Sequence, residues 1–468
     1  MTEGSVHISI TIKVEEVVKE IQIKVLVNEL EDAIQTITLG LGPQVLQGVI
    51  KVLDDRIAEN MGAGWHNVGT ESRWVNSSLG PVYYKRRVYQ DEDRRRWKPL
   101  DELLGVVRYS RMTGRVQEIG SVLAAKGTYR QAANQISYML KTHFSASTIQ
   151  RMIWMVGKRI ADGEEAEERR IFENGDQIET GKIRAPVLYG ESDGVFIHLQ
   201  REKAKSAEVR VAIMSTGRKQ IGEERFRLEN KCCITALGLN SEVWQEKILR
   251  EAHLHYDLEH TRLLITGGDG NQWVRHTFDR IQIHQEFILD RFHLYRAASR
   301  ALQDRKAARE LVTRLRQEGF HRVRPDLIKL IQHSNGARKE KLEDLYRYVQ
   351  HNHDGLLDLE KRGLSHPACM GAIEGNVDKL VVHRMKGRGC SWSLPGARSM
   401  LAICRNVDQL SSHAYRYLPI QPPQKPIHRL HNLAVEYADA MQRTMPVFQG
   451  PHRNKPWVIS LHRAVYGR

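Results

Sequence analysis

The chain has 468 residues, of which 71 are Lys or Arg and 56 are Asp or Glu, so its formal net charge is +15. This length predicts several domains, and the lack of any long uncharged apolar stretch argues against a membrane span. Five cysteines without a Cys-x-x-Cys spacing argue against a disulfide framework and a Cys-rich zinc site. Since the first residues also lack a secretory signal pattern, we expect a cytoplasmic protein.

The positive charge is concentrated outside the first 60 residues, which carry ten acidic and five basic side chains. An excess of bases over the rest of a chain is typical of proteins that bind polyanions. We therefore expect double-stranded DNA as a partner, with localisation at the nucleoid when DNA is bound. A basic surface that is simply solvated is the alternative.

Residues 1–60 are predicted to form an acidic helical segment, with an apolar helical pattern from residue 10 and a break at Gly40–Pro43. Residues 61–110 are predicted to be a small β-rich basic region, with a hairpin turn at Gly80. A run of three basic side chains follows and is a candidate for phosphate contacts: Arg94, Arg95 and Arg96. A solvated loop explains them equally well.

Residues 111–182 are predicted to be a helix-turn-helix-like DNA-binding region. One helix opens at Tyr129, a turn follows at His143, and Ser147 to Gln150 fits a capping box that begins a second helix. The side chains that would face base edges are Thr148, Gln150 and Arg151. Two helices that simply pack together would show the same pattern.

From residue 183 the pattern changes to mixed α/β. Strands are expected at 187–197, 209–213, 232–237, 262–266 and 286–290, with a helix at 241–256 that starts at Ser241. The further segments are expected to be a helical insertion at 295–365, a second part of the core at 366–412 and a basic tail at 413–468. The order of strands and helices predicts a ribonuclease-H-like core, 183–294 and 366–412, interrupted by the insertion.

That fold gathers carboxylates at adjacent strand ends, where Asp193, Asp269 and Glu374 would lie. Carboxylate oxygens suit Mg²⁺ or Mn²⁺, and two such ions can promote phosphodiester cleavage. Each acid also has an ordinary explanation, a hairpin turn for Asp193, a flexible glycine turn for Asp269 and a surface helix for Glu374. Glu191 is a rival for the first position because residues two apart share a strand face.

Two further groups are candidates at the site. Asp290 and His293 form an Asp-x-x-His pattern after the last strand, and His293 is either close to the metals or simply packed. After the helix of Glu374, a phosphate clamp and a stacking ring are expected from Lys386, Arg388 and Trp392. A basic loop with a core tryptophan is the alternative.

Five stretches in this order resemble DDE transposases of bacterial insertion sequences. They are KRRVYQDEDRRRWKPLDELLGV (85–106), YGESDGVFIHLQ (189–200), GGDGNQW (267–273), LDRFHL (289–294) and IEGNVDKLVVHRMKGRGCSWSLPGA (373–397). The similar branch is the ISLre-type family, formerly an uncharacterised protein family and related to Mutator-like transposases, which carry an Asp- or Cys-x-x-His signature. The resemblance implies a ribonuclease-H-like core with the Asp193, Asp269 and Glu374 triad holding two Mg²⁺ ions.

The expected function is therefore a transposase that binds the ends of an insertion sequence and performs strand cleavage and strand transfer. Bringing two ends together requires at least a dimer, and no membrane is expected to take part. Two alternatives remain, a ribonuclease-H-like structural nuclease or resolvase, and a non-catalytic DNA-binding regulator derived from a transposase.

Overall fold

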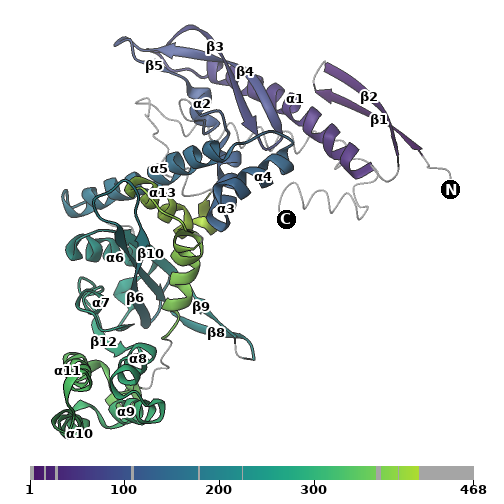
Figure 1. Ribbon diagram of the computed structural model, residues 1–468. Coiled ribbons are helices and arrows are strands. Elements are labelled where there is room, and N and C mark those ends of the chain that lie inside the picture. Colours follow the sequence, from purple (N-terminus) through teal and green to yellow (C-terminus); the bar gives the residue numbers. More distant parts are fainter. Residues whose placement is uncertain are drawn as a thin grey trace. The chain divides into compact units, whose positions relative to one another are not determined.

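The structure is a computed structural model (Figure 1), and it describes residues 5–14, 17–26, 30–106, 110–177, 180–223, 225–364, 370–387 and 389–410. The described residues belong to two units. One includes the chain up to Gly120 and Ala132–Ala146, and the other includes Ser121–Gln131 and Ser147–Leu410. The predicted tail at 413–468 lies outside the described residues.

The chain starts with a β-hairpin where a helix was predicted. Strand β1 (Ser5–Val14) pairs antiparallel with β2 (Val17–Leu26). Isoleucine occupies positions 8, 10 and 12, and this alternation is the period of a strand. The helical prediction for this part was wrong because it gave weight to apolar content and overlooked the two-residue period.

Helix α1 (Leu30–Glu59) continues through the predicted break and contains Pro43. A side chain at Gly42 would collide with Leu79 in the turn of the following hairpin. The glycine therefore serves close packing of the hairpin on the helix, and the prediction of a break there was wrong.

Within α1, residues Ile34–Glu59 are long and apolar enough to cross a membrane, judged by length and composition alone. Core helices and signal sequences meet the same criterion. Ile50 and Ile57 of this helix are buried against the neighbouring sheet. The absence of a membrane partner remains a prediction.

A three-stranded sheet covers α1, in the region predicted to be β-rich. Its order is β3 (His66–Ser77), β4 (Gly80–Gln90) and β5 (Arg96–Trp97), and the short helix α2 (Pro99–Leu103) follows. The shared core consists of Ile50, Ile57, Val75, Val82, Tyr84, Tyr89, Leu100 and Val106.

Three helices follow in the chain, α3 (Gly114–Lys126), α4 (Tyr129–Leu140) and α5 (Ala146–Phe172). Residues 141–145 join α4 to α5, where a turn was predicted. Helix α5 begins at Ala146, so Ser147 lies inside its first turn and the predicted cap position was wrong by one or two residues.

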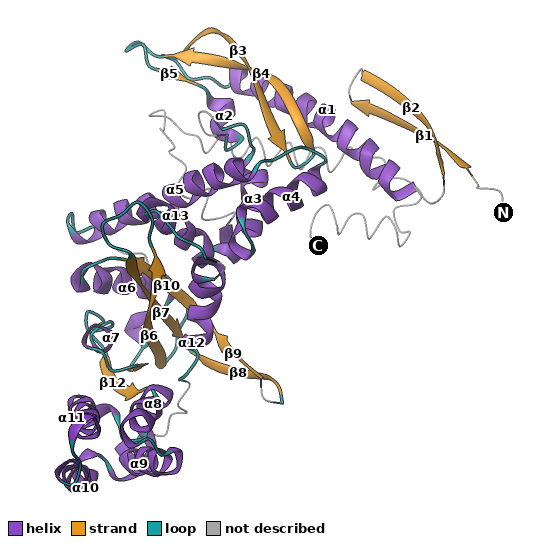
Figure 2. Cartoon of the chain, viewed as in Figure 1, coloured by secondary structure: helices purple, strands orange, loops and turns teal. Residues whose placement is uncertain are grey.

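A five-stranded mixed sheet forms the centre of the second unit and confirms the predicted mixed α/β class (Figure 2). Its strands are β6 (Val187–His198), β7 (Ser206–Ser215), β10 (Cys232–Leu237), β11 (Leu263–Gly268) and β12 (His284–Leu289). They lie in the order β10-β7-β6-β11-β12. Strands β6, β11 and β12 are parallel to one another, whereas β7 is antiparallel to both β6 and β10.

Helix α6 (Ser241–His255) packs on this sheet through Trp244 and Ile248. Asn240 caps the helix, because its side-chain oxygen accepts a hydrogen bond from the Val243 N–H at 2.8 Å. The predicted start of the helix at Ser241 is confirmed, and the capping residue is the one before it. The short helix α7 (Gln272–Arg275) follows β11.

The sequence did not predict the second hairpin of this unit, formed by β8 (Gly217–Gly222) and β9 (Arg225–Glu229). Its strands are short and mostly charged, with few apolar residues to mark a buried face. Figure 1 shows the pair projecting from the end of the sheet.

Four helices follow β12, where the helical insertion was predicted: α8 (Arg291–Leu302), α9 (Arg305–Glu318), α10 (Phe320–Gln332) and α11 (Gly336–His351). They have their own core, which includes Leu294, Leu315 and Leu345. The insertion is therefore a packed helical subdomain.

The chain then returns to the sheet through α12 (Ile373–Val377), a π-helix (Asp378–Lys386) and α13 (Leu394–Arg405). Helix α13 lies so close to α5 that a side chain at Gly157 would collide with the backbone of Ser399. This contact holds α5 against the helices that follow the insertion.

Candidate functional site

The strand register brings three aspartates level with one another. Gly267 pairs with Glu191 of β6, so Asp269, which follows β11, lies level with Asp193. Gly268 pairs with Leu289 of β12, so Asp290 lies level with Asp269 on the other side. Neighbouring strands are about 4.8 Å apart, and level residues of parallel strands point to the same face.

The glycines around Asp269 are required by close packing, so this segment is not a flexible turn. A side chain at Gly268 would lie 2.8 Å from the Ser192 carbonyl oxygen. Gly270 has a φ of +83°, and a side chain there would collide with Asn352. Tyr348 of α11 donates its hydroxyl to the Asp269 carbonyl oxygen at 2.7 Å. The helical insertion thus helps to fix Asp269, a role for which the sequence carried no signal.

The carboxylates influence one another's charge. Burial raises the pKa of Asp193, and the charges of Asp269 and Asp290 raise it further. Burial also acts to raise the pKa of Asp290, but hydrogen bonds from His293 outweigh it and the pKa is lowered. The hydrogen bond to Asp290 raises the pKa of His293.

Asp290 and His293 form one local unit at the start of α8. The Asp290 Oδ1 caps this helix by accepting the His293 N–H at 2.9 Å, and it also contacts the ring Nδ1 at 3.1 Å. His293 therefore lies beside the aspartates. Asp290, predicted as part of the Asp-x-x-His pattern, is level with Asp193 and Asp269 themselves.

Glu191 has a different role from Asp193. Its side chain is 4% exposed and accepts backbone N–H groups from the start of α12, at 2.7 Å from Gly371 and 3.2 Å from Ala372. Burial raises the pKa of Glu191, and this effect is larger than the lowering caused by these hydrogen bonds. Because its oxygens already have backbone donors, Asp193 is the better metal ligand on this strand.

Replacing Glu191 with Gln should lower the free energy of unfolding by about 1.5–3 kcal/mol, because the charged acceptor of several buried donors is lost. Urea denaturation of both proteins measures the change. Glu202 is a matched control, since its single backbone hydrogen bond is long, 3.5 Å, and exposed. An equal loss in Glu202→Gln would contradict a special role for Glu191.

Glu374 is exposed and belongs to α12, the helix whose start is held by Glu191. Among the described residues it has no hydrogen bond or ion pair that joins it to the three aspartates. The helix of Glu374 is thus connected to β6 through Glu191, whereas Asp290 is level with the other two aspartates.

The predicted DNA contacts differ in exposure. Arg94, Arg95 and Arg96 are exposed, the first two at the turn before β5 and the third as the first residue of β5. Gln150 and Arg151 are exposed on the first turns of α5, and Thr148 is half-buried. Lys386 is exposed at the end of the π-helix, and Arg388 lies outside the described residues.

Trp392 is only 6% exposed, and its Nε1–H donates to the Met385 carbonyl oxygen at 2.8 Å. This burial favours the alternative of a tryptophan held in the protein, and a contact between its ring and DNA stays a prediction.

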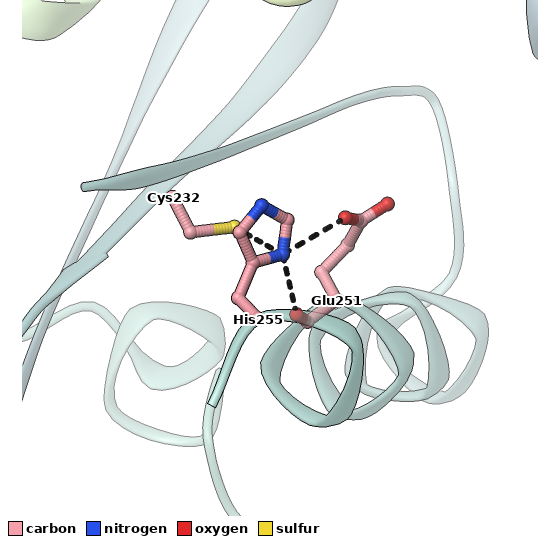
Figure 3. Close-up of side chains that lie close together, drawn as sticks. All are labelled: Cys232, Glu251 and His255. Atoms are coloured by element: carbon pink, nitrogen blue, oxygen red, sulfur yellow. Dashed lines mark hydrogen bonds and ion pairs between the residues drawn. The ribbon is translucent and has the colours of Figure 1, made fainter. Parts of the chain in front are cut away.

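A second group of potential metal ligands lies on α6 and β10. Figure 3 shows Nδ1 of His255 directed toward Cys232, the Glu251 backbone oxygen and the Glu251 carboxylate. Burial holds the pKa of the Cys232 thiol well above its usual range. The Glu251 carboxylate is paired with the buried Arg250. A protonated thiol and a carboxylate already paired with a guanidinium make a poor cation site, so we assign this group to packing.

The family profile described as "Uncharacterised protein family (UPF0236)" matches residues 21–410. This match covers most of the chain, including every strand of the five-stranded sheet. The chain belongs to UPF0236.

Relatives of this UPF0236 chain share the same family name. A Streptococcus gallolyticus protein, "UPF0236 protein in vanSb 3'region", is 25% identical over 80% of this chain and 82% of its own length. A Caldanaerobacter subterraneus subsp. tengcongensis protein is 23% identical over 81% of this chain and 77% of its own length. The name of the second joins eleven locus labels from one strain.

Proposed function

We propose that this protein is a DDE-type transposase of an insertion sequence, with a ribonuclease-H-like catalytic core. The observation that carries the proposal is the row of level aspartates along three adjacent parallel strands, with Asp193 in β6, Asp269 directly after β11 and Asp290 directly after β12. The sheet order and strand directions, with three antiparallel strands followed by two parallel ones, agree with the order expected of that fold.

The donor set fits divalent cations such as Mg²⁺ or Mn²⁺. Burial and mutual repulsion raise the pKa of Asp193, and a cation relieves both effects. Asp193 and Asp269 would hold the metal together with Asp290 or Glu374. When bound, two such ions supply charge stabilisation for phosphodiester cleavage.

The reaction we propose has two steps. Water attacks the phosphodiester bond at the end of the element and leaves a 3′-hydroxyl and a 5′-phosphate. That hydroxyl then attacks target DNA and releases a new 3′-hydroxyl there, without a covalent protein–DNA intermediate. In both steps the aspartates remain in place, and His293 is held beside them by Asp290.

DNA binding is proposed for α5, which exposes Gln150 and Arg151 in one unit, and for the start of β5 with the turn before it, which expose Arg94–Arg96 in the other. A homodimer or larger assembly would hold two ends together. The eleven locus labels of the Caldanaerobacter relative support the proposal, because an element that copies itself leaves the same gene at many loci.

The test uses purified protein and linear DNA that carries the ends flanking the gene. In Mg²⁺ we expect strand breaks at the end boundary that leave 3′-hydroxyls, and in Ca²⁺ binding without breaks. Denaturing gels with end labelling map the breaks. Breaks at junctions or hybrids irrespective of end sequence would replace the transposase with a structural nuclease. End binding with no breaks in Mg²⁺ or Mn²⁺, also after two ends are joined on one DNA, would favour a regulator.

A further inference from the structure

A cavity of about 330 Å³ lies beside the first turns of α5, in the same unit as the sheet. It is bounded by residues 128–129, 150–151, 153–154, 200, 384, 390–393 and 396. Three aromatic rings and two guanidinium groups line it: Tyr129, Trp154, Trp392, Arg151 and Arg384. No Asp or Glu is among the described residues of its lining.

The inner wall of the cavity is rigid. The Arg384 guanidinium lies 4.9 Å from the ring centroids of both Tyr129 and Trp392. Its Nε–H donates to the Ala124 carbonyl oxygen at 2.6 Å. The two rings meet edge to face at 6.4 Å. The shape of the cavity therefore exists before any ligand enters.

The charge of the cavity is positive. Arg384 is 6% exposed, and within the described residues neither Arg384 nor Arg151 forms an ion pair with a carboxylate. Burial raises the pKa of Tyr129 to about 12, so its hydroxyl stays neutral. A buried guanidinium without a counter-charge is stabilised when an anion approaches. Flat rings together with unpaired guanidinium groups suit a planar aromatic ligand that carries a phosphate.

We infer that this cavity receives a single unpaired base of the DNA end, turned out of the duplex, with its phosphate at Arg151. The inference rests on the proposed function for the source of the DNA. Trp154, 47% exposed at the rim, offers a face for stacking, and the Gln150 amide offers polar contacts. The volume is at the lower end of small-molecule sites, which fits one nucleotide.

The cavity is connected to the strand that carries Asp193. The Trp392 N–H donates to the His198 carbonyl oxygen at 3.0 Å, and the Gln200 N–H donates to the Trp392 carbonyl oxygen at 2.9 Å. His198 is the last residue of β6, and a strand rises about 3.3 Å per residue, so Asp193 lies roughly 17 Å away along it. That is roughly five nucleotide steps at 3.4 Å each. The extruded base should therefore lie a few nucleotides from the cleaved bond.

The test measures affinity for end duplexes with one T·T mismatch placed in turn at each of the terminal positions. A mispaired base is easier to extrude, so one position should bind about tenfold more tightly than the paired duplex. Trp154→Ala should abolish this gain and Trp154→Phe should retain it. Because Trp154 is half exposed, unchanged unfolding midpoints will show that both variants fold. No favoured position, or an equal gain in Trp154→Ala, overturns the inference.

A second measurement separates this inference from the proposed function. Binding of single-stranded (dT)8 should weaken in Trp154→Ala and recover in Trp154→Phe, whether or not the protein cuts DNA. Trp154-dependent (dT)8 binding without any cleavage would keep the base site and remove the transposase. Cleavage at element ends, together with (dT)8 binding that does not depend on Trp154, would keep the transposase and remove the base site.

Discussion

Replacing Asp193 with Asn should abolish Mg²⁺-dependent cleavage of element ends while leaving end binding intact. The amide keeps the size of the side chain and removes the charge that would hold the cation. Loss of one group that stabilises the transition state lowers rates by at least about 10²–10³-fold. Gel-shift titration measures binding, and end-labelled DNA measures cleavage in the same preparation.

The matched control is Asp279→Asn, which changes an exposed aspartate that pairs with His276 on the surface. Its cleavage rate should equal that of the unmodified protein. Asp290→Asn and Glu374→Gln, assayed in parallel, decide which carboxylate is the third ligand. Cleavage by Asp193→Asn within tenfold of the unmodified protein would remove Asp193 from the site.

Replacing Glu164 with Gln should be among the most destabilising single changes in the second unit. Glu164 is 4% exposed and joins α5 to two other helices, through Arg405 of α13 and Lys247 of α6. Removing one partner from a buried ion pair leaves an uncompensated charge and costs about 3–5 kcal/mol. Chemical denaturation followed by circular dichroism measures the difference in free energy of unfolding.

Glu165 is the control for this experiment, one residue further along the same helix. Its pair with Arg398 is about half exposed, so Glu165→Gln should change the free energy of unfolding by less than about 1 kcal/mol. Similar losses of unfolding free energy in the two variants would show that the buried ion pairs stabilise the protein no more than an exposed pair does.

The same cluster predicts a loss of stability in acid. Although burial acts to raise it, the charges of Arg250 and Arg405 lower the pKa of Glu251 to about 2. A carboxyl whose pKa is lowered by folding stabilises the protein above its unfolded value of about 4.3, and this contribution falls as the pH drops toward 2. Denaturation at pH 7, 4 and 3 measures the slope, which Glu251→Gln should reduce.

Much of the central sheet could be predicted from sequence, because its strands carry apolar runs of the right length. Residues 187–197 and 232–237 were expected as strands, and β6 and β10 lie there. The same reasoning failed for residues 5–26, where apolar content outweighed a clear alternation. It also missed β8 and β9, whose charged residues leave no apolar face to detect.

The candidate site was only partly predictable for a physical reason. Asp193 and Asp269 stand out because each lies beside glycine, Asp193 within a strand and Asp269 directly after an apolar one. Either Asp290 or Glu374 could complete the site. The choice depends on the register between strands and on where α12 begins, and neither can be read from a single sequence. The Tyr348 hydroxyl, 79 residues from the Asp269 carbonyl that it contacts, gives no local signal at all.

The packing of Gly157 against Ser399 has a mechanical consequence. It packs α5, the helix proposed to read DNA, directly against α13, which follows the proposed catalytic carboxylates in the chain. A reading element that cannot pivot sets a fixed number of base pairs between the sequence it recognises and the bond that is broken. Inserting one base pair into that interval should therefore stop cleavage, whereas a tethered reading domain would tolerate the change.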